Sequence, residues 1–248
     1  MKKLVKIYGE RNTNTNYLSE LIRLNLALPE VPGVVPSSVK RYQDKWPGKE
    51  WLRDLYFFSS YGRNLGWKHA AVDWPRLKRT GLYRRNSVTV VTLTKNPYAW
   101  LLSLYKRPYH QYYVTKPTFS EFLTRPWKTV CREGMPRWVE TPVHLWNAKN
   151  ASYLRYADEG RALHLRAEDT LIDPREVIKK IAQAAGLTCP SEFINVLSST
   201  KDGNKDFNYY RDYYLGERWR SGLGEQDVVI INQQLDKTLV EYYGYSFL

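Results

Sequence analysis

The sequence predicts an α/β fold of three layers, in which helices cover both faces of a central parallel sheet. The first observation is a set of short apolar runs at residues 3–8, 88–94 and 162–166, whose lengths are typical of buried strands. The second is that helix-like segments separate these runs, an alternation that favours parallel pairing. The third is size, since 248 residues, 43% of them hydrophobic, suit one domain with a substantial core. We therefore predict a single domain over residues 1–248.

The first helix is predicted over residues 15–28, directly after the first strand. Its large apolar residues recur with a period near 3.6, which places them on one face of a helix. These residues are Leu18, Leu21, Ile22 and Leu28. We expect this face to pack against the sheet.

Capping signals indicate where two further helices begin. Asn96 is a suitable N-cap, and Pro97 fits the first helical position after the strand at residues 88–94. Residues 173–176, Asp-Pro-Arg-Glu, combine an N-cap, a proline at the first helical position and a glutamate at the third. The helix that they open should end at Gly186, since glycine is common just beyond helix ends.

The remaining elements are predicted from weaker patterns. We expect two insertions, near residues 29–66 and 106–140, and a third irregular segment at residues 201–224, because all three are rich in aromatic, basic, proline or glycine residues. We expect a strand end at residues 65–69 and three further helices at residues 73–81, 138–156 and 225–242.

The net charge narrows the range of partners. The chain carries 38 lysines and arginines against 25 aspartates and glutamates, a formal charge of +13, which favours an anionic ligand. Its two cysteines form no C-x-x-C motif, and its four histidines show no metal-ligand spacing, so we expect neither a disulfide framework nor a metal site. The first apolar run is too short for a signal peptide or a membrane span, which leads us to expect a cytoplasmic protein.

Two turns have the composition of anion sites. Residues 9–15 follow the first strand, residues 95–97 follow the strand at 88–94, and each turn opens a helix. A helix N-terminus offers unpaired N–H groups and a positive dipole end, which suit phosphate. Two such ends in one domain predict a ligand with two separate phosphate groups.

These segments resemble motifs of the sulfotransferases that use 3′-phosphoadenosine 5′-phosphosulfate (PAPS). Residues 9–18 resemble the family's 5′-phosphosulfate loop, and Lys95-Asn96-Pro97 with Ser103 and Tyr105 resembles its 3′-phosphate motif. Further likenesses occur, in the order of the family, at residues 67–69, 165–174 and 241–245. The resemblance implies a sulfotransferase core similar to that of P-loop NTPases, with PAPS as the donor and no metal.

The resemblance also implies roles for particular residues. Those expected to hold the donor's 5′-phosphosulfate belong to the first turn: Arg11, Asn12, Thr13, Asn14, Thr15 and Asn16. Lys95 and Ser103 are expected to bind the 3′-phosphate, and Arg220 is a further candidate. His69 is the expected general base, since it titrates near neutrality, and Lys68 with Arg11 would neutralise charge on the transferring group. Glu168 is a second candidate for the base, although a role in orienting its loop is the more ordinary one.

The first turn departs from the family pattern in a way that predicts a backbone conformation. It is one residue longer than the usual loop and lacks its glycine. Asn14 is the residue that we expect to adopt the left-handed conformation instead, because asparagine tolerates a positive φ better than most residues. Lys95 replaces the usual arginine, which keeps the charge and loses the two-pronged contact.

The function predicted is transfer of a sulfuryl group from PAPS to the hydroxyl of an acceptor, a carbohydrate or a small molecule, with release of adenosine 3′,5′-bisphosphate. A P-loop kinase is the first alternative, disfavoured because the first turn lacks Gly-Lys-Ser/Thr. The second is a non-enzymatic protein that binds polyanions or nucleic acid, suggested by the charge and the many aromatics, although nucleic acid is not the partner that we expect. The acceptor and the oligomeric state stay open.

Overall fold

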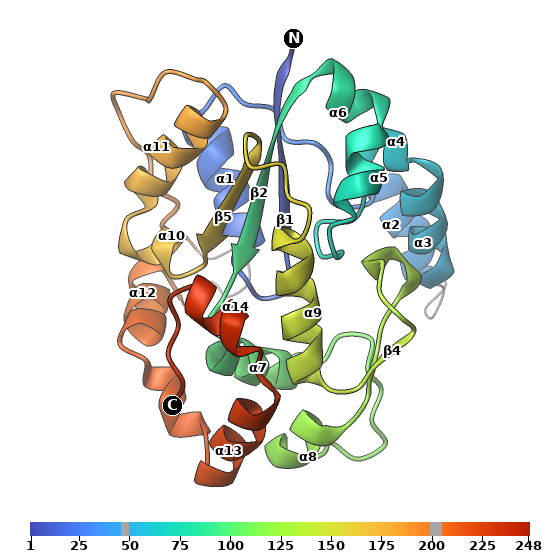
Figure 1. The fold of residues 1–248 in the computed structure, drawn as a ribbon, viewed down its shortest axis with the longest axis vertical. Helices are drawn as coiled ribbons and strands as arrows, with labels where there is room; N and C mark the ends of the chain where they lie inside the picture. The colour runs from blue at the N-terminus through green and yellow to red at the C-terminus, as the bar shows by residue number, and fades with distance from the viewer. Residues whose placement is uncertain (46–49, 199–204) are drawn as a thin grey trace.

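A three-stranded parallel sheet runs through the centre of the molecule (Figure 1). The structure is a computed structural model that describes residues 1–45, 50–198 and 205–248. Its strands are β1 (Lys3–Gly9), β2 (Ser87–Thr94) and β5 (Ala162–Arg166), in the order β1-β2-β5. The three strands predicted from apolar runs are therefore confirmed, and the β-branched β2 is the central one, hydrogen-bonded on both sides.

Helices cover both faces of the sheet, which confirms the three-layer α/β prediction (Figure 1). On one face, α1 (Thr15–Asn25) and α11 (Pro174–Ala184) pack on Val5, Ile7 and Val91 of the strands. On the other face, α5 (Trp74–Arg79), α6 (Gly81–Arg85) and α9 (Pro142–Leu154) bury Leu4, Tyr8, Val88 and Val90. Alternate residues of β1 thus pack on opposite faces, as the period of a strand requires.

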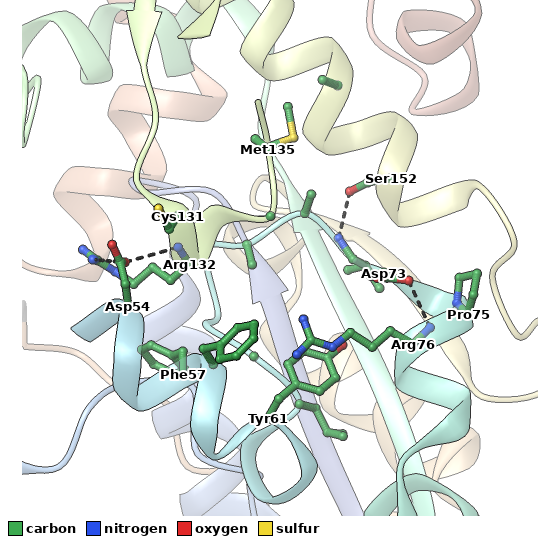
Figure 2. A pocket seen from close by; sticks show the side chains of 18 of the residues that line it. Asp54, Phe57, Tyr61, Asp73, Pro75, Arg76, Cys131, Arg132, Met135 and Ser152 are labelled. Atoms are coloured by element: carbon green, nitrogen blue, oxygen red, sulfur yellow. Dashed lines mark hydrogen bonds and ion pairs between the residues drawn. The ribbon is translucent and has the colours of Figure 1, made fainter. Parts of the chain in front are cut away.

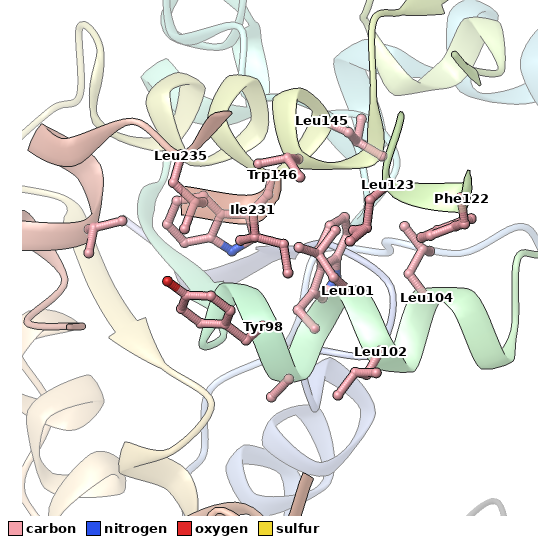
Figure 3. Close-up of a cluster of buried hydrophobic side chains, with 14 of the residues drawn as sticks. Tyr98, Leu101, Leu102, Leu104, Phe122, Leu123, Leu145, Trp146, Ile231 and Leu235 are labelled. Carbon is pink, nitrogen blue, oxygen red and sulfur yellow. The ribbon is translucent and has the colours of Figure 1, made fainter. Parts of the chain in front are cut away.

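A second apolar cluster lies beyond the carboxyl ends of the strands (Figure 3). It joins α7 (Pro97–Lys106), α8 (Phe119–Thr124), α9, the short helix η2 (Arg218–Gly222), α13 (Glu225–Gln234) and α14 (Lys237–Tyr242). Two of its buried indoles also donate hydrogen bonds towards the strand ends, Trp100 to the carbonyl oxygen of Arg11 at 2.9 Å and Trp146 to that of Lys95 at 3.0 Å. The cluster therefore fixes the two turns that the sequence marked as anion sites.

The capping predictions are confirmed. The side chain of Asn96 accepts from the backbone N–H groups of Tyr98 and Ala99, with Pro97 at the start of α7. Asp173 accepts from the N–H of Glu176 at the start of α11. Gly186, which has a φ of +63°, follows the end of that helix.

Both predicted insertions contain short regular elements. Residues 29–66 include α2 (Ser37–Asp44), α3 (Glu50–Ser59) and α4 (Tyr61–Asn64). Residues 46–49 of this predicted insertion lie outside the described part of the chain. Residues 106–140 include α8, the short helix η1 (Cys131–Glu133) and the hairpin strands β3 (Trp127–Lys128) and β4 (Trp138–Val139). The irregular segment includes α12 (Phe207–Leu215) and η2, and its residues 201–204 lie outside the described part.

Several boundaries differ from the predictions for physical reasons. Residues 65–69 are not a strand, because Leu65 and Gly66 have φ values of +58° and +92°, which no strand accommodates. The helix expected to run to Gly81 ends at Arg79, and the Thr80 side chain caps α6. The helix predicted at residues 225–242 is two helices, since Leu235 is extended and Asp236 caps α14. A third helix starts at Pro142 rather than residue 138. Among the described residues, no helix is long and apolar enough to cross a membrane.

Candidate active site

The carboxyl ends of all three strands meet at one edge of the sheet, where ligands of parallel α/β folds bind. The turn after β1 comprises residues 10–14, and that after β2 comprises residues 95–96. The chain after β5 is tied to its neighbour by the Ala167 N–H, which donates to the carbonyl oxygen of Thr94 at 2.8 Å. Both predicted anion turns therefore lie at the same edge.

The turn after β1 folds back tightly over the end of its strand. At Gly9, a Cβ atom would lie only 2.8 Å from both Thr13 Oγ1 and Thr15 Cγ2, so this position requires glycine. Asn12 and Asn14 have φ values of +67° and +62°. The left-handed conformation predicted for Asn14 is thus confirmed. Asn14 is also the N-cap of α1 and makes no side-chain cap hydrogen bond, which leaves the first turn of that helix open to an acceptor from outside.

His69 is attached to the same turn. Its Nδ1 atom lies 2.6 Å from the carbonyl oxygen of Gly9, and because a carbonyl only accepts, Nδ1 carries the proton. A neutral ring then leaves the Nε2 lone pair unprotonated. Burial lowers the pKa of His69 well below its usual value, and the nearby charges of Arg11 and Lys68 lower it further. At neutral pH this imidazole is an uncharged acceptor.

Lys68 is held between the two segments by its own backbone. Its N–H donates to the carbonyl oxygen of Gly33 at 3.0 Å, and its carbonyl oxygen accepts from the N–H of Gly9 at 2.8 Å. Its ammonium donates to Oδ1 of Asn16, on the first turn of α1. The structure therefore brings the predicted Lys68–His69 pair against the predicted turn.

Lys95 and Ser103 also come together. The buried Nζ of Lys95 lies 3.5 Å from Ser103 Oγ and 3.4 Å from the carbonyl oxygen of Asn12, which joins the second anion motif to the first. Tyr214 of α12 covers the group, with its ring centroid 3.5 Å from Nζ. Burial alone raises the pKa of Tyr214, but Lys95 outweighs it and the pKa lies below its usual value.

Four buried charged residues form a compact cluster under the first turn. Arg11 lies 3.2 Å from Glu10 and 2.9 Å from Glu133, and Lys149 lies 3.2 Å and 3.3 Å from the same two carboxylates. The charges cancel in pairs, as burial demands. Although burial raises the pKa of Glu10, Lys149 and Arg11 hold it below its ordinary value. The guanidinium of Arg11 therefore faces two carboxylates, while its predicted role as a phosphate ligand stays a prediction.

Aromatic rings sandwich the same guanidinium. The centroid of Trp67 lies 4.7 Å from its central carbon, and that of Tyr109 lies 5.0 Å away. The guanidinium of Arg132 also lies over the Trp67 ring, with its central carbon 4.5 Å from the ring centroid. The rings of Trp67 and His69 meet edge-on, with their centroids 5.0 Å apart. Arg132 in turn pairs with Asp54 at 2.8 Å. This stack links the turn after β1 to α3 and η1.

Solved structures with a similar fold cover the whole chain. The sulfotransferase domain of the Synechococcus PCC 7002 olefin synthase has a TM-score of 0.51 at 15% identity, over 100% of this chain and 98% of that one. The chain has a sulfotransferase fold. Two others have lower TM-scores: a sulfotransferase domain of the curacin biosynthetic pathway (0.45, 10% identity, 100% and 99% covered) and a sulfotransferase from Alicyclobacillus acidocaldarius (0.43, 13%, 99% and 97%). The sequence matches no family model and no curated protein.

Two further predicted residues occupy different positions on this sulfotransferase fold. Glu168 accepts from the N–H of Asn96 at 3.0 Å and from the hydroxyl of Tyr245 at 2.8 Å, so it orients the turn after β2. Arg220 is exposed and pairs with Glu217 at 2.7 Å on η2. Glu168 thus makes the contacts expected of a residue that orients its loop, while Arg220 faces solvent.

Sequence reasoning missed the acidic half of the buried cluster and its lysine. Glu10, Glu133 and Lys149 are far apart in the chain, and nothing local marks the first two. Lys149 did carry a signal, because Leu145, Lys149 and Tyr153 recur every four residues on the buried face of α9. A lysine in an apolar stripe indicates a buried partner of opposite charge.

Proposed function

We propose that this protein transfers a sulfuryl group from PAPS to a hydroxyl of an acceptor and releases adenosine 3′,5′-bisphosphate. One observation carries the proposal: a neutral histidine with an unprotonated Nε2 is fixed to the same turn that opens α1. A proton acceptor and an anion-binding helix end are the two parts that such a transfer requires. The sulfotransferase fold supports the assignment.

Polar groups at the strand ends support PAPS as the donor. The side-chain N–H₂ of Asn12 is buried and has no hydrogen-bond partner among the residues that the structure describes, although its Oδ1 accepts from Tyr109 at 2.7 Å. The contacts of Lys95 to Asn12 and Ser103 are long, so its ammonium has capacity for a stronger, charged acceptor. We assign the 3′-phosphate to Lys95 and Ser103, and the 5′-phosphosulfate to the N–H groups of residues 12–16.

Bound PAPS supplies a sulfur atom made electrophilic by its phosphate leaving group. On the protein side, Lys68 places a positive charge next to the start of α1, where negative charge develops. His69 accepts the acceptor's proton at Nε2, and the Gly9 carbonyl stabilises the resulting imidazolium through Nδ1. Arg11 has a supporting part: paired with Glu10 and Glu133, it holds the turn and helps to keep His69 neutral.

Tyr214 occupies part of the proposed 3′-phosphate site. Its ring lies on the Lys95 ammonium, so a phosphate that binds there replaces this contact. Because α12 carries Tyr214, we expect this helix to adjust when the nucleotide binds.

Titration calorimetry with adenosine 3′,5′-bisphosphate tests the proposal, with AMP and ADP as controls. We expect the bisphosphate to bind selectively, because only it offers phosphates to both turns. Equal or absent binding of all three would overturn the sulfotransferase assignment. ATP with Mg²⁺ and single-stranded oligonucleotides then test the kinase and nucleic-acid alternatives.

A further inference from the structure

A cavity of about 880 Å³ opens on the side of the sheet that carries α9 (Figure 2). Residues of α3 and α4 line one side, residues of α9 line another, and residues 65–66, 70–73 and 75–76 form a further part of the wall. This volume lies in the range of pockets that enclose small organic molecules. The side chains that we assign to the donor do not line it, so its ligand is a second molecule.

The wall of this cavity is largely apolar. Phe57, Leu65, Ala70 and Val72 contribute buried side chains, and Leu55 and Phe58 reach it while 55% and 74% exposed. The free energy falls when an apolar ligand covers apolar surface that a cavity otherwise leaves in contact with water. The composition therefore favours an apolar ligand.

Several polar groups of the wall already have partners within the protein (Figure 2). Asp54 pairs with Arg132 at 2.8 Å, and Asp73 accepts from the N–H of Arg76 at 3.0 Å. The guanidinium of Arg76 lies 3.8 Å from the ring centroid of Tyr61. A glycan would have to place many of its hydroxyls against a largely apolar wall, and burying them there without hydrogen bonds is unfavourable.

Part of the cavity wall directly follows His69 in the chain. Ala70 and Ala71 line the cavity and follow His69 directly in the chain. Phe57 and Ala70 pack with Trp67, whose ring meets the His69 imidazole edge-on at 5.0 Å. A ligand that fills the cavity therefore lies against the segment that follows His69 and against residues that pack with Trp67.

We propose that this cavity binds the acceptor, and that the acceptor is an apolar molecule with one hydroxyl rather than a carbohydrate. This inference rests on the proposed sulfuryl transfer. The O–H bond breaks and its proton moves to Nε2 of His69 as the acceptor oxygen bonds to sulfur. The bond from sulfur to the phosphate oxygen breaks, and its electron pair leaves with adenosine 3′,5′-bisphosphate.

The two cysteines provide a binding test that needs no turnover. Cys131 is exposed and lines the cavity, whereas Cys189 is exposed and does not line it. The alkylation rates of both thiols by N-ethylmaleimide are measured by mass spectrometry, with 2-naphthol, 1-decanol or cellobiose present. We expect 2-naphthol or 1-decanol to slow alkylation of Cys131 at least threefold, cellobiose to have no effect, and Cys189 to react unchanged.

A variant that fills the cavity provides the second test. Ala148→Phe places a ring in the cavity from α9, and Ala184→Phe makes the same change at an exposed site of α11. We expect Ala148→Phe to abolish both the protection of Cys131 and sulfuryl transfer from radiolabelled PAPS to the apolar probe. Binding of adenosine 3′,5′-bisphosphate should change less than twofold, and Ala184→Phe should behave as the wild type.

The outcomes separate this inference from the function on which it rests. If the bisphosphate binds but neither apolar probe protects Cys131 or is sulfated, the cavity assignment is overturned and the proposed function stands. If cellobiose protects Cys131 as well as the apolar probes do, the apolar class is wrong. If the probes protect Cys131 and the bisphosphate does not bind, the sulfuryl transfer and the acceptor role of the cavity are both overturned.

Discussion

The Nδ1 atom of His69 lies 2.6 Å from the carbonyl oxygen of Gly9, the residue at which β1 ends and the first turn begins. This contact fixes the tautomer of the ring and its place beside the turn. A second contact holds the backbone of the same residue, since Lys149 donates to the His69 carbonyl oxygen at 2.5 Å. His69 is thus tied to the sheet and to the buried charge cluster at once.

Replacement of His69 by alanine should lower turnover with little effect on nucleotide binding. We expect kcat to fall by roughly 10²-fold or more, because a positioned base contributes about that much. The affinity for adenosine 3′,5′-bisphosphate should change less than twofold. Steady-state kinetics and calorimetry measure the two, with His144→Ala as the control on the partly exposed imidazole of α9. Unchanged kcat in His69→Ala would remove this residue as the base.

The pH dependence of kcat/KM and of stability should also report on His69. Since burial lowers the pKa of His69 well below 6.5, kcat/KM should stay level through neutral pH and fall only in more acidic solution. Between the lowered folded pKa and the unfolded value near 6.5, the unfolded chain binds more protons, so stability falls as pH falls through that window. Denaturant unfolding of His69→Ala should lack this component. A kcat/KM that declines already from pH 8 to pH 6.5 would contradict the assignment.

Lys95→Ala should remove the preference for a 3′-phosphate. Because the buried ammonium supplies the positive charge of this site, we expect adenosine 3′,5′-bisphosphate to bind at least tenfold more weakly, close to AMP. Calorimetry measures both ligands. Lys237→Ala, at a lysine whose side chain is 78% exposed, is the control and should retain the preference. An equal loss of AMP affinity in Lys95→Ala would show that Lys95 does not act through the 3′-phosphate.

Glu133→Gln should destabilise the fold strongly. The substitution leaves Arg11 and Lys149 with only one carboxylate between them, and an uncompensated buried charge costs about 3–5 kcal/mol. Chemical denaturation measures this free energy of unfolding. Glu140→Gln makes the same change at a side chain that is 84% exposed, where we expect less than about 0.5 kcal/mol. Similar values for the two variants would show that the cluster contributes little.

Lys6 should impose a second pH dependence on stability. Lys6 lies in β1, and its buried Nζ donates to the carbonyl oxygens of Asn64 and Gly66 at 2.6 Å; burial lowers its pKa to about 7. The unfolded chain keeps this proton up to about pH 10.5, so stability rises with pH between 7 and 10.5, at up to about 1.4 kcal/mol per pH unit. Lys6→Met should lose this slope between pH 7 and 9, whereas the exposed Lys237→Met should keep it. Parallel curves for Lys6→Met and the wild type would disprove the lowered pKa.

Local patterns predicted the framework of the site well. The strand at residues 88–94, the caps at Asn96 and Asp173 and the left-handed Asn14 all depend on neighbours a few residues away. Local patterns failed where two conformations competed. Residues 65–69 have strand-like composition, yet the backbone turns at Leu65 and Gly66, whose carbonyls accept from Tyr8 and Lys6 of β1.

The sequence by itself determined the order of the strands along the chain, the ends of the main helices and the two turns that suit phosphate. It did so because strand periodicity, capping and turn conformation are short-range effects. Only the tertiary structure decided that Arg11 and Lys149 both face Glu133, that Tyr214 covers Lys95, and that a cavity opens between α3 and α9. Those features depend on how elements far apart in sequence pack, and buried charges take whichever partner the packing brings within ion-pair distance.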